Sequence, residues 1–496
     1  MSDHADATLI LEGTYPYVAG GVSTWVHQLL HAYPTRRFGL LHISPHPGAY
    51  TKRAFELPQN VIELRDVYCR GAAKPQLRRS SSGQPRLLPR GAQPSRVLAG
   101  IRRLHLEDRV DDQMLADLSS GDLSLKELLH GEEAFDLVRN DLYPRLSPHA
   151  PFMDFFWHFR GMHIPLLRLL STTCPEASMY HAVSAGYAGL LGAVASWRTG
   201  RPLAITEHGI YAREREIELA RASWIKDVGG REMARPSPLR RFWHHFFQML
   251  SRIAYHRATH VITLSEANRT RQLADGADPA KTYVVPNGVD RARFRAPADG
   301  RLARRDQPMR IGFVGRVVPI KDVITLIRAC SLAADQVDIE VWIVGPEDED
   351  QSYADRCHAL VESLGLEEHV RFLGPQPMTE IYPQLDVLVL TSISEGQPLV
   401  ILEAHAAGLP VVSTDVGACR ELIEGGDDGD RDLGASGIVT RVANPIETAA
   451  ALVYLAKHPE VRVRMGRNGL ARVTARYQQE HVVARYDSLY QEMVLS

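Results

Sequence analysis

Short apolar runs separated by longer amphipathic stretches fill most of this chain. In the first half, the apolar runs cover residues 7–11, 38–44, 61–65, 178–183, 202–206 and 260–265. In the second half, they cover residues 309–314, 339–344, 370–373, 387–390 and 410–413. Runs of this length that alternate with helical patterns are typical of strands buried on both faces of a parallel sheet. The pattern therefore predicts an α/β protein with two Rossmann-like, doubly wound parallel sheets in tandem.

A boundary between the two series is expected near residue 290, where the sequence Pro286-Asn287-Gly288 has the composition of a turn. We therefore expect one domain over residues 1–290 and a second over residues 291–478. A terminal amphipathic helix over residues 479–496 is expected to pack on either domain, including back on the first. Ligands bind at the carboxyl ends of strands in open α/β sheets, so the two domains are expected to face each other across a ligand-binding cleft.

Residues 66–170 interrupt the alternation of strands and helices and are expected to be an insertion. Between Asp66 and Glu107 this segment holds nine Lys or Arg residues and no acid. Its middle, residues 78–96, is rich in Ser, Gly, Pro and Gln, which predicts a mobile polar loop. From there to about residue 170 the pattern is helical. We expect this basic loop, residues 70–103, to meet an anionic membrane face or an acidic partner; a tolerated surface loop is the alternative.

The bulk composition excludes several classes of protein. The net charge of −2 creates no field that would attract nucleic acid, so no nucleic-acid partner is expected. Five scattered cysteines without C-x-x-C spacing argue against a disulfide framework or a zinc site and fit a reducing compartment. The N-terminus lacks the basic and apolar pattern of a signal peptide. We therefore expect a cytoplasmic protein.

Two glutamates, Glu395 and Glu403, flank a predicted strand-to-helix turn in the second half. Glu395 follows the run at residues 387–390, and Pro398 stands where a helix would begin. Free amides at the start of that helix favour negative charge on a sugar or phosphate. Glu403 lies more than one turn into the helix, where it would accept hydrogen bonds from a diol such as a ribose. For this pair alone, two solvated glutamates beside an ordinary helix are the alternative.

Two cations occupy an equivalent turn earlier in the same half. Arg316 and Lys321 follow the run at residues 309–314 and precede a helical pattern. A planar guanidinium and a flexible ammonium together suit the two phosphates of a diphosphate. Together with the two glutamates, they predict a site for a sugar nucleotide at the carboxyl edge of the second sheet.

The first half offers weaker candidates at its own carboxyl edge. Gly20 and Gly21 precede a helical pattern at residues 22–33, where glycine lets backbone amides approach a phosphate or acceptor closely. His208 follows the run at residues 202–206, and we expect it to contact the donor sugar. An ordinary turn and a structural histidine are the respective alternatives.

Two acidic clusters and one basic helix complete the candidates. Asp348–Asp350 and Asp428–Asp430 imitate an Asp-x-Asp metal motif, but both are interpreted as solvated loops, so no metal and no cofactor are expected. The amphipathic stretch at residues 239–257 is interpreted as a core-packed helix with a basic outer face. Docking of this helix to a membrane or partner is the alternative.

Three motifs in residues 259–480 resemble the nucleotide-sugar domain of the family 4 retaining glycosyltransferases. They are Gly-Arg-x4-Lys from Gly315, Glu-Gly-x-Pro-x4-Glu from Glu395, and the Ala-x2-Gly-Leu-Pro-Val-Val-like run from Ala404. The resemblance implies the GT-B architecture and a metal-independent reaction with retention, in which the leaving phosphate accepts the proton. It also implies the site residues. Those implied or expected to be catalytic are His208, Glu395, Arg316 and Lys321; those expected to bind the donor are Gly20, Gly21, Arg316, Lys321, Glu395, Gly396, Gln397, Pro398, Leu399 and Glu403.

Residues 12–25, 180–187 and 206–215 are similar to the PelF branch of this family, the glycosyltransferases of Pel exopolysaccharide synthesis. This similarity implies a UDP-sugar donor, either UDP-glucose or a UDP-N-acetylhexosamine, and a growing polysaccharide acceptor. It implies a place beside an inner-membrane synthase complex. A non-catalytic UDP-sugar-binding scaffold and a UDP-hexosamine epimerase are the alternatives.

Overall fold

The computed structural model describes residues 4–71, 95–225, 237–294 and 307–495, and these residues form two compact units. Unit 1 comprises Met1–Thr263, Thr270–Tyr283 and Ser488–Ser496. Unit 2 comprises Leu264–Arg269 and Val284–Asp487. Each unit is built on one sheet, so the prediction of two doubly wound α/β sheets is confirmed.

The sheet of unit 1 has seven strands in the order β3-β2-β1-β4-β5-β6-β7. Neighbouring strands from β3 to β6 pair in parallel. Most apolar runs of the first half became strands at or near their expected positions because both faces of this sheet are covered. The strands are β1 (Ala7–Glu12), β2 (Phe38–Ser44), β3 (Val61–Tyr68), β4 (Tyr180–Ala182), β5 (Leu203–Glu207), β6 (His260–Thr263) and β7 (Thr282–Val284).

The helices α1 (Gly21–Ala32), α8 (Tyr187–Thr199) and α10 (Pro238–Arg257) contribute many buried residues to unit 1. Helix α8 is buried over most of its length, and α10 buries eleven residues. The interpretation of the stretch at residues 239–257 as a core-packed helix is therefore confirmed. Among the described residues, no helix is both long and apolar enough to cross a membrane.

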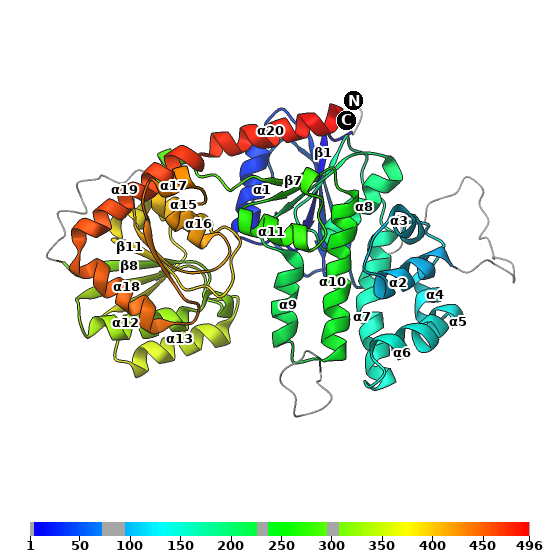
Figure 1. Cartoon of the computed structure of the whole chain (residues 1–496), viewed down its shortest axis with the longest axis horizontal. Coiled ribbons are helices and arrows are strands. Elements are labelled where there is room, and N and C mark those ends of the chain that lie inside the picture. The colour runs from blue at the N-terminus through cyan, green and yellow to red at the C-terminus, as the bar shows by residue number, and fades with distance from the viewer. Residues whose placement is uncertain (1–3, 72–94, 226–236, 295–306, 496) are drawn as a thin grey trace. The chain divides into compact units, whose positions relative to one another are not determined.

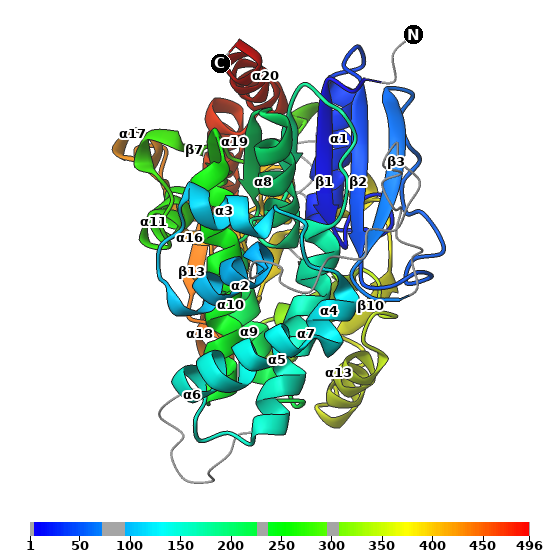
Figure 2. The ribbon, with the colours of Figure 1, turned by 90° about the vertical axis from the view of Figure 1, so that its right-hand side faces the viewer.

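Residues 66–68 of the expected insertion belong to β3, and from Arg96 to Leu170 the insertion is mostly helical. Figures 1 and 2 show its helices gathered around the long helix α7. The elements are α2 (Arg96–Leu106), α3 (Asp112–Leu118), α4 (Leu125–His130), α5 (Glu132–Asp136), the π-helix η1 (Leu137–Leu142), α6 (Tyr143–Leu146) and α7 (Phe152–Leu170).

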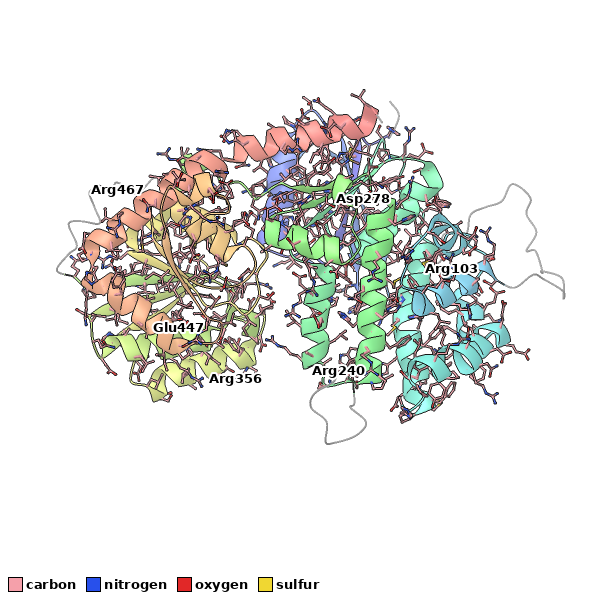
Figure 3. All side chains as sticks on the ribbon, viewed as in Figure 1. Arg103, Arg240, Asp278, Arg356, Glu447 and Arg467 are labelled. Atoms are coloured by element: carbon pink, nitrogen blue, oxygen red, sulfur yellow. The ribbon has the colours of Figure 1, made fainter. Side chains whose placement is uncertain are left out.

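The prediction of a basic loop over residues 70–103 is wrong at its end. Residues 72–94 lie outside the described residues, but Arg96, Arg102 and Arg103 belong to α2. Arg103, labelled in Figure 3, contacts Glu107 and Asp111 at 2.9 and 2.8 Å. Arg96 and Arg102 pair with acids of other insertion elements. The carboxylates that pair with these three arginines all lie beyond the acid-free interval.

Helix α10 is fastened to the end of α9 (Tyr211–Arg221) by one arginine. Arg240, at the foot of α10 in Figure 3, donates to the carbonyl oxygens of Leu219, Ala222 and Ile225. Leu219 and Ala222 lie at the carboxyl end of α9, so a guanidinium there adds hydrogen bonds to that end and favours the helix dipole.

The sheet of unit 2 has six parallel strands in the order β10-β9-β8-β11-β12-β13. Five of them were predicted, and the edge strand β13 was not. The strands are β8 (Met309–Val314), β9 (Ile339–Val344), β10 (Val370–Gly374), β11 (Val387–Leu390), β12 (Val411–Thr414) and β13 (Gly437–Thr440). The main helices are α12 (Val323–Ala334), α13 (Gln351–Ser363), α15 (Leu399–Ala406), α16 (Cys419–Glu424), α18 (Pro445–Lys457) and α19 (Pro459–Arg476).

The terminal helix α20 (Gln479–Leu495) contributes to both units, which divide it after Asp487. Near its start, Val289 pairs with Gln478, and a Cβ atom at Gly288 would lie 2.7 Å from the Cα of Gln479. Only glycine allows this close approach. In unit 1, the hydroxyl of Tyr490 bonds Nδ1 of His181 at 2.6 Å.

Candidate functional site

The loops after β8 and β11 in unit 2 are tied together, and this brings Lys321 to Glu395. Lys321 closes the short 3₁₀ helix η5 (Pro319–Lys321), directly before α12. The amide of Ile393 donates to the carbonyl of Ile320 at 2.8 Å, and the hydroxyl of Thr391 donates to the carbonyl of Lys321 at 3.1 Å. These bonds hold the backbone of one candidate against that of the other at the carboxyl edge of the sheet.

Lys321 and Glu395 form a close ion pair. Nζ of Lys321 lies 2.5 Å from Oε1 of Glu395, and the hydroxyl of Ser392 donates to the same oxygen at 2.6 Å. The two charged side chains are only 19% and 12% exposed, so solvent screens the pair less than an ordinary surface pair. Ser392 was not identified from the sequence, where it is one of several small residues after the strand.

Arg316 lies in the same loop as Lys321 but has a different partner. Its Nη1 lies 2.6 and 2.5 Å from the two carboxylate oxygens of Glu349. Both side chains are more exposed than those of the first pair, at 38% and 49%. The structure thus places both predicted phosphate-binding cations at one edge of the unit 2 sheet, each beside a carboxylate.

The loop that carries Glu395 ends at α15, whose first residue is Leu399. Pro398, which the sequence places at the first helical position, is instead the N-cap residue that precedes α15. The amides of the first turn have no acceptor within the helix and form a site for partial negative charge. A Cβ atom at Gly417 would lie 2.2 Å from the carbonyl oxygen of Glu395, so this glycine lets the next loop pack against the site.

Gln397 has a structural partner that the sequence did not reveal. Its Oε1 accepts the amide of Asn287 at 2.5 Å, and its carbonyl oxygen accepts from Nδ2 of Asn287 at 3.1 Å. Both residues are buried. Gln397 therefore fastens the candidate donor loop to the turn at residues 286–288, and its contact with a sugar stays a prediction.

Glu403 lies on α15 beside a tyrosine. Its Oε2 accepts the hydroxyl proton of Tyr382 at 2.7 Å, and burial raises the pKa of the Glu403 carboxyl. Tyr382, in the 3₁₀ helix η6 (Tyr382–Gln384), is itself fully buried. Its hydroxyl orients the carboxylate. The role of Glu403 at a ribose stays a prediction.

The two glycines before α1 stand at an open helix start in unit 1. Gly20 is the N-cap with an extended backbone, φ 166°, and α1 begins at Gly21. A Cβ atom added at either position would meet no atom within 4 Å. The fold of unit 1 therefore does not itself demand glycine here, which agrees with close approach of a ligand to these amides.

His208 lies directly after β5 in unit 1. Its ring meets the edge of Trp25 with centroids 4.7 Å apart, and its buried Nε2 has no hydrogen-bond partner among the described residues. Burial lowers the pKa of His208 to about 3, so the imidazole is neutral at ordinary pH. A neutral ring with one unused nitrogen offers a donor or acceptor to a ligand hydroxyl.

Two further glutamates at the same edge, the half-buried Glu12 and the buried Glu207, were not identified as site residues from the sequence. Oε2 of Glu12 accepts the amide of Tyr187 at 3.1 Å, at the start of α8. Oε1 of Glu207 accepts the amide of Tyr211 at 3.0 Å, at the start of α9, and Oε2 accepts the hydroxyl of Tyr255. Both acids hold helix starts against the ends of strands.

The two Asp-x-Asp clusters differ from each other. Asp350 caps α13 by accepting the amide of Tyr353 at 3.0 Å. The interpretation of Asp428–Asp430 as a solvated loop is wrong, because these residues belong to the short helix α17 (Asp428–Arg431) and Asp430 pairs with the fully buried Arg472 at 2.7 Å. Within the described ranges, no group of three or more His, Cys, Asp or Glu residues is arranged to hold a metal ion.

Two family models match the chain, and they divide it near the boundary between the units. Residues 5–280 match a domain of unknown function, DUF3492. Residues 296–472 match glycosyl transferases group 1. The second match contains every candidate of unit 2 from Arg316 to Glu403, and the first contains Gly20, Gly21 and His208.

Curated relatives are similar mainly over part of their length. The chain is 29% identical over 307 residues to the MMP alpha-(1->4)-mannosyltransferase of Mycolicibacterium hassiacum, covering 60% of this chain and 67% of the relative. It is 35% identical over 232 residues to the D-inositol 3-phosphate glycosyltransferase of Kineococcus radiotolerans, covering 42% of this chain and 52% of the relative. The chain thus spans about half the length of that second relative.

Among solved structures, Anabaena HepE in complex with UDP-glucose has a similar fold. The TM-score is 0.60 at 18% identity, with 98% of this chain and 99% of that chain covered. The chain therefore belongs to the family defined by the DUF3492 domain and, through its second domain, to the group 1 glycosyltransferases of the GT-B fold.

Proposed function

We propose that this protein transfers a hexose from a UDP-sugar to a growing polysaccharide, with retention at the anomeric carbon and without a metal ion. The observation that carries the proposal is the pair of cations, Arg316 and Lys321, at the carboxyl edge of the unit 2 sheet, beside the Glu395 loop. A nucleoside diphosphate sugar carries its negative charge where these cations would meet it.

Loss of UDP from the anomeric carbon is the demanding step, since negative charge develops on the departing diphosphate. Preorganised positive groups lower that barrier because they need little reorganisation during the reaction. Arg316, Lys321 and the first amides of α15 supply such groups. The leaving phosphate itself accepts the proton of the acceptor hydroxyl, so no carboxylate nucleophile is assigned.

The other candidates receive roles that follow from their positions. Glu395 binds hydroxyls of the donor sugar, together with Gly396 and the start of α15. Glu403, oriented by Tyr382, accepts from the ribose. In unit 1, His208 offers its unused nitrogen to the sugar, and the open amides at Gly20 and Gly21 approach the phosphate or the acceptor.

For the biological context, we propose the Pel type of exopolysaccharide synthesis, at the cytoplasmic side of an inner-membrane synthase complex. Support comes from the similarity of residues 12–25, 180–187 and 206–215 to the PelF branch. HepE, which has the same fold, was solved in complex with UDP-glucose, which supports UDP as the nucleotide. The donor sugar under this proposal is glucose or an N-acetylhexosamine.

The test is incubation of purified protein with UDP-glucose, UDP-GlcNAc and UDP-GalNAc in separate reactions, with and without hexose or N-acetylhexosamine oligosaccharides. Released UDP and the sugar products are measured together. A transferase releases UDP and elongates an oligosaccharide or hydrolyses the donor with retention. Conversion of one UDP-sugar into another would instead identify an epimerase, and UDP-sugar binding without any turnover would identify a scaffold.

A further inference from the structure

We propose that Glu349 is a built-in competitor of the donor, whose carboxylate occupies the guanidinium of Arg316 until a nucleoside diphosphate displaces it. The proposal rests on the proposed function of Arg316 as a diphosphate-binding residue. It adds a regulatory residue that the motifs of the site do not contain.

The loops that carry the two residues are fastened to each other by their backbones. The amide of Gly315 donates to the carbonyl of Val344 at 2.9 Å, and the amide of Val317 donates to that of Pro346 at 2.9 Å. These two bonds straddle Arg316. A Cβ atom at Gly345 would lie 2.0 Å from the carbonyl oxygen of Gly315, and Gly345 has φ 150°, so only glycine permits this approach.

The segment beyond Pro346 is also held at its far side. Asp350 caps α13, and Oε2 of Glu347 lies 2.6 Å from Nε2 of His358 on the same helix. Glu349 therefore stands between a fixed start and a fixed end, with its carboxylate on Arg316. The backbone bonds at both ends of the segment therefore hold the Glu349 carboxylate close to Arg316.

A carboxylate on a guanidinium occupies the position that a phosphate group would take, because both present paired oxygens to the same N–H donors. The Glu349 pair is half-exposed, so it can open into water at small cost. A diphosphate brings more negative charge than one carboxylate and also reaches Lys321. It therefore displaces Glu349, whereas a single weak anion gains less from the exchange.

Two consequences follow for the reaction. Donor binding has to exchange one anion for another at Arg316, so the observed affinity for UDP is lower than the affinity of a free Arg316 would give. After transfer, the return of Glu349 to Arg316 favours release of UDP. Glu349 thus limits product retention at a site that must bind the same diphosphate in donor and product.

The experiment compares UDP binding by calorimetry for the wild type, Glu349→Gln and Glu347→Gln at 20 mM and 500 mM NaCl. Glu347→Gln is the matched control: it removes the same charge from the same loop, but its partner is His358. We expect Glu349→Gln to tighten UDP binding about two- to fivefold at low salt, the range of an exposed ion pair. The control should stay near wild type, and the difference should shrink at high salt.

A double variant completes the design. In an Arg316→Ala background, Glu349→Gln should no longer change the dissociation constant, because the competitor has lost its target. If Glu349→Gln and Glu347→Gln tightened UDP binding equally, the effect would come from the loss of net charge alone, and the proposal would be wrong. Unchanged or weaker UDP binding in Glu349→Gln would overturn it as well. Failure of the wild type to bind UDP at all would instead contradict the proposed function itself.

Discussion

The carboxyl edges of the two sheets use glutamate in two different ways. In unit 1, the half-buried Glu12 and the buried Glu207 accept hydrogen bonds from helix amides and tyrosine hydroxyls. In unit 2, Glu349 and Glu395 pair with cations, and those side chains stay in contact with solvent to differing degrees. In unit 1 the glutamates accept from neutral donors, so an anionic ligand has no cation to bind there. In unit 2 an anionic ligand can replace the glutamate as the partner of the cation.

The unit 1 glutamates therefore stabilise the fold, whereas the unit 2 glutamates belong to the proposed ligand site. A buried acid whose oxygens satisfy fixed amides stabilises one geometry, and its loss exposes those amides to an apolar surrounding. The half-exposed Arg316–Glu349 pair contributes little to stability and can open without unfolding. We therefore expect variants at the unit 1 edge to act on the fold and variants at the unit 2 edge to act on the ligand.

The largest expected effect comes from acid. Burial lowers the pKa of His163 to about 4 and of His181 to about 3, and holds the pKa of His105 well below its usual value; all three lie in unit 1. In unit 2, burial lowers the pKa of His405 to about 3. Because these rings are neutral in the fold and take up a proton below about pH 6.5 when unfolded, stability falls as the pH drops from 6.5. At pH 5 each of His163, His181 and His405 removes about 2 kcal/mol.

These histidines should make unit 1 lose more stability than unit 2 between pH 7.5 and pH 5, although protonation of Glu214, whose pKa burial raises to about 7, offsets part of the loss. Hydrogen exchange followed by mass spectrometry separates peptides of the two units and measures this directly. Equal loss of protection in both units would contradict the expectation that unit 1 is the more acid-sensitive unit.

Glu207→Ala should be the most damaging single substitution at the unit 1 edge. It leaves the backbone amide of Tyr211, the hydroxyl of Tyr255 and the side-chain amide of Gln272 without their acceptor, at a cost of about 3–5 kcal/mol. Five of the six tryptophans lie in unit 1, so tryptophan fluorescence in urea reports its unfolding. Glu395→Ala, the counterpart in unit 2, should leave that transition near wild type. Similar destabilisation by both changes would contradict the division of roles.

Gln397→Ala should have a smaller, local effect. It removes the acceptor for the buried amide of Asn287, which costs about 1–3 kcal/mol in unit 2. Gln397→Glu keeps an oxygen for that amide and serves as the control. Hydrogen exchange at the amides around residues 286–288 should rise in the alanine variant and change less in the glutamate variant. Slow exchange in both Gln397 variants would mean that the bond from Asn287 to Gln397 does not hold the turn in place.

Gly20→Ala should have the smallest effect on stability and still affect turnover. Its extended backbone and open surroundings accept a methyl group, so we expect less than about 0.5 kcal/mol of change. UDP release from the donor should nevertheless fall about tenfold, since the methyl group stands where the ligand approaches. Gly200→Ala is the converse control: Gly200 has φ 71°, so alanine there strains the end of α8 by about 1 kcal/mol while turnover per folded molecule stays unchanged.

Most of the fold could be predicted from the apolar runs because both faces of each sheet are covered. Residues 309–314 and 339–344 became strands with those bounds. The short edge strand β13 was missed, since an edge position leaves part of its residues half-exposed and breaks the apolar run. The acids that pair with Arg96, Arg102 and Arg103 lie at or beyond residue 107, so the acid-free segment itself could not reveal that these charges are neutralised.

The candidate site could be predicted as far as its backbone positions. Strand ends and glycine-containing turns placed Arg316, Lys321 and Glu395 at one edge. Their partners could not be predicted, because Glu349 reaches Arg316 only through the backbone fastening of two loops, and Gln397 reaches Asn287 across more than a hundred residues. Likewise, nothing near Asp430 in the sequence reveals the buried Arg472 that pairs with it.

The central claim is that Arg316 and Lys321 bind the diphosphate of a UDP-sugar. Calorimetric titration of UDP into the wild type, Arg316→Ala, Lys321→Ala and the double variant tests it most directly. We expect each single change to weaken UDP binding by about 2 kcal/mol or more, roughly thirtyfold, while hydrogen exchange shows both units folded. UDP affinity near the wild-type value in both single variants, with the fold intact, would contradict the account.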